Sequence, residues 1–217
     1  MSSKRQSKAN AKPTKLGNKS TQPSGQVRII GGAFKRRLIS FIDADGLRPT
    51  PDRLRETLFN WLTADLHDAA VLDVCAGSGV LGFEAISRGA KSAVMIEANA
   101  AQARTLTQSA ATLKIHAPNL QALQNGGAHI IHSTAQNALP LLDAPFDVIF
   151  LDPPYALNLW HELITLIITH GLYHQDTLIY LESDQPLTDI IAPFDKLELI
   201  KSAKVGQVFA GLAVFND

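Results

Sequence analysis

Hydrophobic and polar positions alternate in two ways along this chain. Up to about residue 65 they predict a β-hairpin followed by a helix, and from residue 69 short apolar runs alternate with helical segments. The expected strands lie at 70–74, 93–96, 128–131, 147–151 and 177–181, the helices at 80–87, 99–114 and 160–169, and a closing hairpin at 197–216. This α/β pattern predicts a doubly wound, mostly parallel, seven-stranded Rossmann-like sheet with a C-terminal antiparallel hairpin. Ligands of such sheets bind at the carboxyl ends of the strands.

The N-terminal part is expected to form an appendage to that sheet. Its hairpin covers residues 26–42, and a helix is expected to run from Thr50, as the capping residue, to about residue 64. Residues 1–25 are basic, contain no acidic residue and have few apolar ones, which predicts a disordered arm. The predicted organisation is therefore an arm at 1–25, an extension at 26–65 and a main domain at 66–217.

Charge is divided unevenly along a chain of zero net charge. Residues 1–55 hold 13 Lys or Arg against 3 Asp, whereas residues 56–217 hold 7 Lys or Arg against 17 acidic residues. A basic end on an acidic body favours a polyanionic partner such as nucleic acid, although a solubilising tail would have the same composition.

Other features of the composition limit the class of protein. A single cysteine, Cys75, excludes an internal disulfide framework. No apolar stretch approaches the roughly 18 residues of a membrane span, and no secretory signal follows the basic start. We therefore expect a cytoplasmic protein without membrane association, and a monomer by default.

A glycine-rich loop follows the first strand of the main domain. Gly77, Gly79 and Gly82 have the spacing of a dinucleotide-binding loop, and Glu97 lies at the end of the next strand. Asp73 argues against a dinucleotide, because a carboxylate beside the loop would repel a pyrophosphate. S-adenosylmethionine has no phosphate and carries an ammonium and a sulfonium, so we favour this cofactor. A tight turn without a ligand, or a nicotinamide dinucleotide, is the alternative.

A second motif, Asp152-Pro153-Pro154-Tyr155, directly follows the apolar strand at 147–151. An exocyclic amino group on a base is a poor nucleophile and needs acceptors that turn its lone pair toward the methyl carbon. Asp152 and the Pro153 carbonyl can accept its two N–H groups, and Tyr155 offers a stacking face for a base taken out of its stack. Transfer would be an in-line displacement driven by positioning, without a metal. The alternative is a plain strand-ending turn.

Several segments together resemble the RsmD family, the 16S ribosomal RNA (guanine-966-N2)-methyltransferases. The resemblance covers about residues 27–215 and rests on 28–32, 47–50, 52–60, 73–79, 81–85, 152–155 and 205–207. It implies a class I methyltransferase fold and N2 methylation of one guanine in 16S rRNA, within an assembled or partly assembled small subunit, with S-adenosylhomocysteine as the second product. Many relatives carry Asp or Asn where this chain has Thr134, whose hydroxyl can accept one hydrogen bond from the adenine.

The expected site residues fall into three groups. The cofactor is expected to contact Asp73, Cys75, Ala76, Gly77, Gly79, Glu97, Ala98, Thr134 and Ala135. The base is expected to contact Asp152, Pro153, Pro154 and Tyr155, and the RNA to contact Lys35, Arg36, Arg37, Arg48, Arg53 and Arg55. We expect no catalytic role for Cys75. Three other functions remain open: a DNA adenine-N6 methyltransferase, an NAD-dependent oxidoreductase and a non-enzymatic RNA-binding assembly factor.

Overall fold

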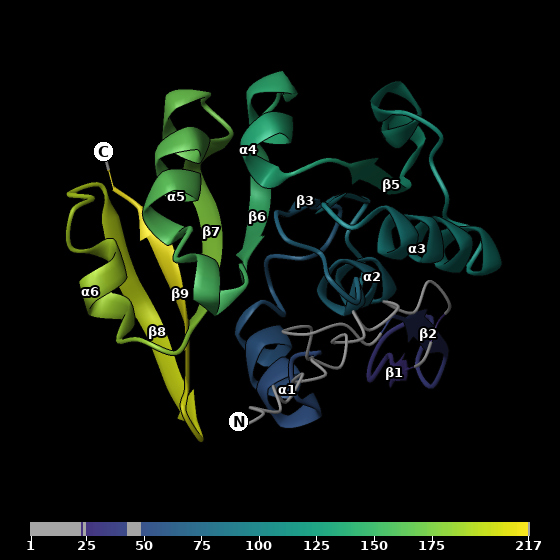
Figure 1. Cartoon of the computed structure of the whole chain (residues 1–217), viewed down its shortest axis with the longest axis horizontal. Helices are drawn as coiled ribbons and strands as arrows, with labels where there is room; N and C mark the ends of the chain where they lie inside the picture. Colours follow the sequence, from purple (N-terminus) through teal and green to yellow (C-terminus); the bar gives the residue numbers. More distant parts are fainter. Residues whose placement is uncertain (1–22, 24, 43–48, 217) are drawn as a thin grey trace, which may run out of the picture.

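The computed structural model describes residues 23, 25–42 and 49–216. Within this part of the chain, the central sheet has seven strands in the order β5-β4-β3-β6-β7-β9-β8 (Figure 1). Parallel pairing joins β5 (Gly127–His132), β4 (Ser92–Glu97), β3 (Ala70–Asp73), β6 (Phe146–Leu151) and β7 (Tyr173–Ser183). β9 (Val208–Phe215) runs antiparallel between β7 and β8 (Leu197–Val205). The predicted sheet and its closing hairpin are confirmed.

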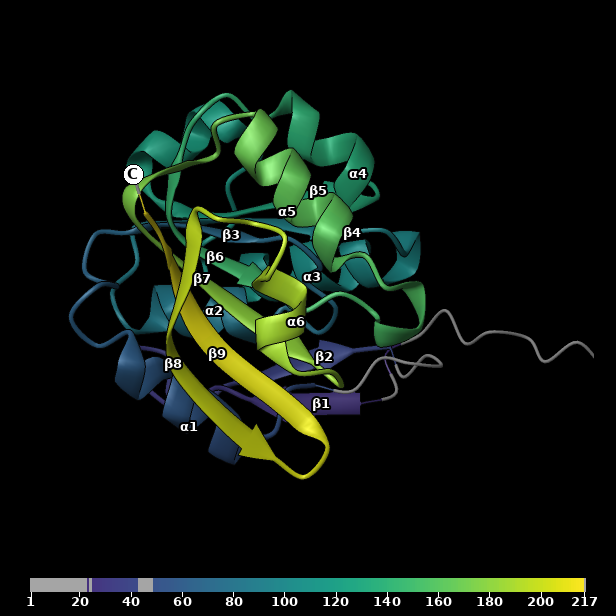
Figure 2. The same ribbon diagram turned by 90° about the vertical axis from the view of Figure 1, so that its left-hand side faces the viewer.

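Helices cover both faces of the sheet (Figure 2). Alternate strand residues such as Phe150 and Tyr180 pack toward α2 (Val80–Ser87) and α3 (Ala100–Thr112). Their neighbours, such as Ile149 and Ile179, pack toward α4 (Ala135–Ala138), α5 (Trp160–Thr169) and α6 (Leu187–Ile191). Burial on both faces explains why the parallel strands are apolar throughout instead of alternating.

The N-terminal extension is part of the same core. It consists of the antiparallel strands β1 (Gly25–Arg28) and β2 (Leu38–Phe41) and the helix α1 (Asp52–Trp61). Ile29, Leu54 and Leu58 are fully buried in one apolar cluster with Val71 of β3. The extension therefore covers the α2 side of the sheet.

The turn between β1 and β2 is docked on the end of α2. Ala33 N–H donates to the Ser87 carbonyl at 2.6 Å, and Phe34 N–H donates to the Ser87 hydroxyl at 2.8 Å. Gly32 has φ +72°, and a Cβ on it would lie 1.7 Å from the Ser87 carbonyl oxygen. Only glycine fits this position, which accounts for one glycine of the N-terminal motif.

Some local expectations are corrected. Thr50 does not cap α1: Pro51 is the capping residue and makes no side-chain bond, while the Thr50 hydroxyl donates to Glu182 at 3.2 Å. α1 ends at Trp61, earlier than expected. The sequence pattern also missed the short helices α4, α6, η1 (Leu120–Asn125), η2 (Leu139–Leu141) and η3 (Tyr155–Leu157). Nearly all of the predicted arm lies outside the described residues. Among those that are described, no helix is long and apolar enough to cross a membrane.

Candidate active site

Acidic side chains line the carboxyl edge of the parallel strands. Asp73 ends β3, Glu97 ends β4, Asp152 follows β6 and Glu182 lies near the end of β7. These strands are neighbours in the sheet, in the order β4-β3-β6-β7. Between β3 and β6 the chain changes the direction in which strands are added, which is where open α/β sheets bind ligands.

Backbone and side-chain hydrogen bonds fix the glycine-rich loop. Glu97 Oε2 accepts from Gly77 N–H at 2.9 Å, and Oε1 accepts from Asn99 N–H at 2.7 Å. The buried Gln102 amide donates to the Gly77 carbonyl at 2.7 Å and accepts from Ile42 N–H, also at 2.7 Å. Gln102 thus joins the loop to the end of β2.

Gly79 is explained by the core. Its φ is +75°, and a Cβ on it would lie 2.5 Å from Leu106 Cδ2 and 2.7 Å from Met95 Cε. The atoms that exclude a side chain here belong to buried residues of α3 and β4. A ligand is therefore not needed to account for this glycine, although the motif that contains it led us to expect one.

The acidic side chains at the carboxyl ends of the strands, called the acidic row below, would favour a positively charged ligand. Burial raises the pKa of Asp73 to about 7, and the charge of Glu97 adds to this rise, while a hydrogen bond from Gly82 N–H opposes it. Burial also raises the pKa of Glu97. Neighbouring ionised carboxylates are stabilised by a positively charged ligand and destabilised by a phosphate. S-adenosylmethionine, with its ammonium and sulfonium, fits this set of carboxylate acceptors, and a pyrophosphate does not.

The remaining expected cofactor residues lie around this row. Cys75 is half-buried, and burial together with the charges of Asp73, Asp152 and Glu97 raises the pKa of its thiol. A raised pKa leaves less of the thiol as thiolate, the form that acts as a nucleophile. Thr134 is exposed at the start of α4, where its side chain makes no capping bond. Ala76 and Ala135 are buried and Ala98 is exposed. Cofactor contact by these residues stays a prediction.

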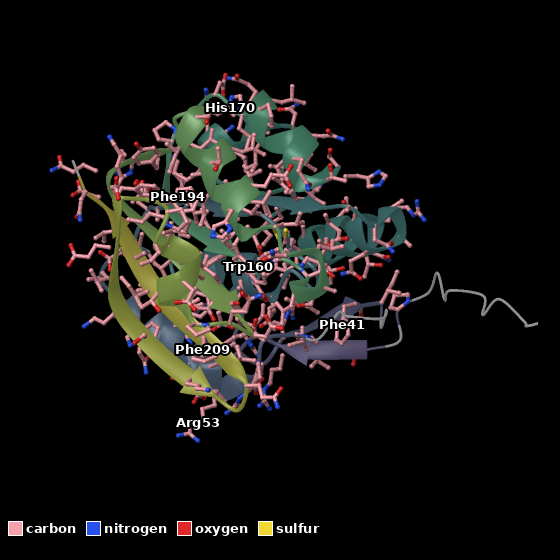
Figure 3. All side chains as sticks on the ribbon, turned by 60° about the vertical axis from the view of Figure 1, so that its left-hand side comes forward. Phe41, Arg53, Trp160, His170, Phe194 and Phe209 are labelled. Atoms are coloured by element: carbon pink, nitrogen blue, oxygen red, sulfur yellow. The ribbon has the colours of Figure 1, made fainter. Side chains whose placement is uncertain are left out.

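The segment Asp152-Pro153-Pro154-Tyr155, called the reaction loop below, directly follows the last residue of β6. Pro153 is buried, Pro154 is exposed and Tyr155 starts the one-turn helix η3. The Tyr155 ring lies 5.8 Å from the ring of Trp160, which is buried in the interior (Figure 3). Its hydroxyl donates to Glu182 Oε1 at 3.3 Å. Burial and the charges of Glu182 and Asp73 raise the pKa of Asp152 well above its ordinary value.

Basic residues of the N-terminal extension are placed in two ways. Lys35, Arg36 and Arg37 are exposed on the turn that is docked on α2. Arg53 is exposed on α1 and points away from the body of the molecule (Figure 3). Arg48 lies outside the described residues.

The expected RNA contact of Arg55 is wrong. Its side chain is 0% exposed, and its Nη1 lies 3.5 Å from Glu84 Oε2, which is also fully buried. Arg55 further donates to the Thr50 carbonyl at 3.0 Å, to the Arg28 carbonyl at 3.0 Å and to Asp52. The guanidinium fastens the extension to α2 and presents no donor to a polyanion.

Sequence reasoning missed Glu182 and Gln102. Glu182 follows the apolar run at 178–181, at the strand end where ligands bind, so its position could have drawn attention to it. Gln102 lies on a helix with no motif around it, and its role depends on contacts with Gly77 and Ile42 that no local pattern reveals.

The fold and the acidic strand edge define a class I methyltransferase. Residues 27–213 match the family described as "Conserved hypothetical protein 95", and the chain belongs to this family. The resemblance to the RsmD family is thereby confirmed. "Ribosomal RNA small subunit methyltransferase D" of Escherichia coli strain K12 is 43% identical over 161 residues, which cover 74% of this chain and 76% of that protein. Its Haemophilus influenzae counterpart is 39% identical, over 75% and 82% of the two chains. The solved structure of Escherichia coli yhhF is 37% identical, with a TM-score of 0.72 over 88% of this chain and 99% of that one.

Proposed function

We propose that this protein transfers a methyl group from S-adenosylmethionine to the exocyclic N2 of a guanine in small-subunit ribosomal RNA. The observation that carries the proposal is the position of Asp152. Asp152 follows β6, which lies between the strands that carry Asp73 and Glu182, and it begins the loop that presents the Tyr155 ring. Relatives of this chain are named small-subunit rRNA methyltransferases, which supports the same reaction here.

The chain's own residues would position the base. When bound, the cofactor supplies a methyl group activated by a sulfonium. The positive charge of the bound cofactor would lower the raised pKa of Asp152 and favour its ionised form. The carboxylate would then accept one amino N–H and the Pro153 carbonyl the other, so that the nitrogen lone pair points at the methyl carbon. Tyr155 stacks on the base. Asp152 or water would take the N–H proton that is released when the amino nitrogen forms its bond to the methyl carbon and the sulfur keeps the electron pair of the broken C–S bond. Positioning therefore supplies most of the rate enhancement.

The basic surface supports an RNA partner. The exposed Lys35-Arg36-Arg37 turn is attached to α2, because Ser87 accepts hydrogen bonds from the N–H groups of the two residues before it, Ala33 and Phe34. Cations fixed in this way can orient a phosphate backbone without reading its sequence. We propose that the protein acts as a cytoplasmic monomer on assembled or partly assembled small subunits.

The test is transfer of labelled methyl from S-adenosylmethionine to unmodified small subunits, free rRNA and duplex DNA, with the product nucleoside identified by mass. We expect N2-methylguanosine from subunits or rRNA. N6-methyladenosine from DNA would instead support a DNA adenine methyltransferase. Binding of NADH but not of S-adenosylmethionine in calorimetry would support an oxidoreductase. RNA-dependent assembly activity that survives Asp152→Ala would support a non-enzymatic factor.

A further inference from the structure

Glu182 lies one strand away from the reaction loop. Leu151 of β6 pairs with Leu181 of β7, so Asp152 and Glu182 follow at matching positions on adjacent parallel strands. Glu182 is only 4% exposed, and its charge acts on the carboxyl of Asp152, which directly follows β6. The two carboxylates are therefore neighbours at the carboxyl edge of the sheet.

Hydrogen bonds hold the Glu182 carboxylate mainly by one oxygen. Its Oε2 accepts from the Tyr180 hydroxyl at 2.8 Å and from the Thr50 hydroxyl at 3.2 Å. Its Oε1 accepts from the Tyr155 hydroxyl of the reaction loop at 3.3 Å. In the described part of the chain, Oε1 thus has only this longer bond, and it is directed toward the loop that would hold the base.

The Asp152 carboxylate, unlike that of Glu182, has no hydrogen-bond donor among the described residues. Burial raises the pKa values of both groups, and the charge of Glu182 raises that of Asp152 further. The Asp152 carboxylate and the Glu182 Oε1 atom are two adjacent acceptors, and a ligand with two adjacent N–H donors would satisfy both.

Guanine carries such a pair on its Watson–Crick edge, the ring N1–H and the exocyclic amino group. Adenine has a lone pair at N1 beside its amino group. This lone pair would face the Glu182 carboxylate with no proton to form a hydrogen bond between them. A buried polar group left unpaired in this way strongly rejects the wrong ligand. We infer that Glu182 is a specificity-determining residue for guanine, whose Oε1 accepts from N1–H while Asp152 accepts from the amino group to be methylated. This inference rests on the proposed function.

The experiment replaces the methylated guanine by 2-aminopurine, which keeps the 2-amino group but has a lone pair at N1. Reconstituted small subunits with either base are compared as substrates for the full-length protein and for Glu182→Gln. The wild-type protein is expected to prefer guanine on the order of 100-fold in kcat/KM. In Glu182→Gln the preference is expected to fall to about tenfold or less, because the glutamine amide can donate to the unprotonated N1.

Tyr180→Phe is the matched control. It removes a hydrogen bond to the same carboxylate but keeps the acceptor, so the wild-type preference is expected to remain. The ratio of the kcat/KM values for the two substrates distinguishes recognition of the base from a purely structural role. A variant with a distorted site would lose both activities equally, and the ratio would not change. An unchanged preference in Glu182→Gln would overturn the inference.

The wild-type protein provides a second measurement that does not depend on folding of the variant. Equal transfer to guanine and 2-aminopurine would overturn the role of Glu182 while leaving the proposed function intact. Absence of transfer to any guanine-containing subunit or rRNA would contradict the proposed function itself, and with it this inference.

Discussion

Asp73, a single buried residue, is expected to make cofactor binding depend on pH. Its carboxylate attracts a cation only when it is ionised, and burial raises its pKa to about 7. Affinity for S-adenosylmethionine should therefore fall as the pH drops below about 7, by up to roughly tenfold per unit. Calorimetric titration at pH values on either side of this point measures the effect. Asp73→Asn should bind more weakly and lose the pH dependence; an unaltered dependence in this variant would assign it to another group.

Asp152 is expected to act on the reaction and not on the cofactor. Asp152→Ala removes a charged acceptor, which costs about 1.5–3 kcal/mol and corresponds to a loss of roughly 10- to 150-fold in kcat. The dissociation constant for S-adenosylmethionine should remain nearly unchanged. Single-turnover methyl transfer and calorimetry on the same preparation separate the two effects. Full turnover in Asp152→Ala would remove the residue from the proposed mechanism.

Residues within motifs were predictable, whereas residues that act through distant contacts were not. Asp73 ends one apolar strand and Asp152 directly follows another, so the sequence places both at the carboxyl edge of the sheet. Gln102 and Arg55 acquire their roles from partners far along the chain, such as Ile42 and Glu84. Arg55 also shows that a basic residue in an RNA-binding family signature can serve the core.

At the scale of elements, the Arg55–Glu84 pair should control how firmly the extension is attached. Glu84 also accepts from Ile30 N–H at 2.8 Å and from Arg88 Nε at 2.8 Å. Glu84→Ala leaves the guanidinium of Arg55 buried without this partner, so we expect a loss of about 3–5 kcal/mol in the free energy of unfolding. Urea denaturation measures it.

The exposed pair between Arg28 and Asp52 provides the comparison for that variant. Its side chains are 58% and 50% exposed, so water screens their charges. Arg28→Ala should therefore lower the free energy of unfolding by no more than about 1 kcal/mol. Similar losses in the two variants would mean that burial does not set the strength of attachment.

The long elements could be predicted from the sequence, whereas the short helices and the tertiary contacts could not. The strands of the sheet, α2 and α5 are largely apolar, and α3 begins after Asn99, whose side chain caps it, so these elements and their order along the chain were predicted correctly. Helices as short as α4 and α6 span about one turn and have no measurable period. Thr50 has the right residue type for a cap, but the buried Glu182 carboxylate takes its hydroxyl bond instead. Competition of this kind depends on the folded structure.

At the scale of the whole molecule, the opposite charges of its two parts suggest how it would meet RNA. The acidic edge of the sheet favours a cationic cofactor and repels phosphate, so the RNA backbone must be held elsewhere while one base enters. We expect the extension to supply that place, because Lys35, Arg36 and Arg37 are exposed on a turn bonded to α2. Replacing all three by Gln should weaken RNA binding most at low salt.

The size of that effect follows from counterion release. Losing up to three phosphate contacts should reduce the slope of log affinity against log salt by about 2 to 3, as measured by fluorescence anisotropy over a range of salt concentrations. Replacing the exposed Lys114, Lys196 and Lys201 by Gln removes the same charge from positions just after α3, just before β8 and within β8, all outside the turn. The slope should stay near the wild-type value in this control. Equal reductions in the two variants would mean that overall charge, and not the placement of the turn, attracts the RNA.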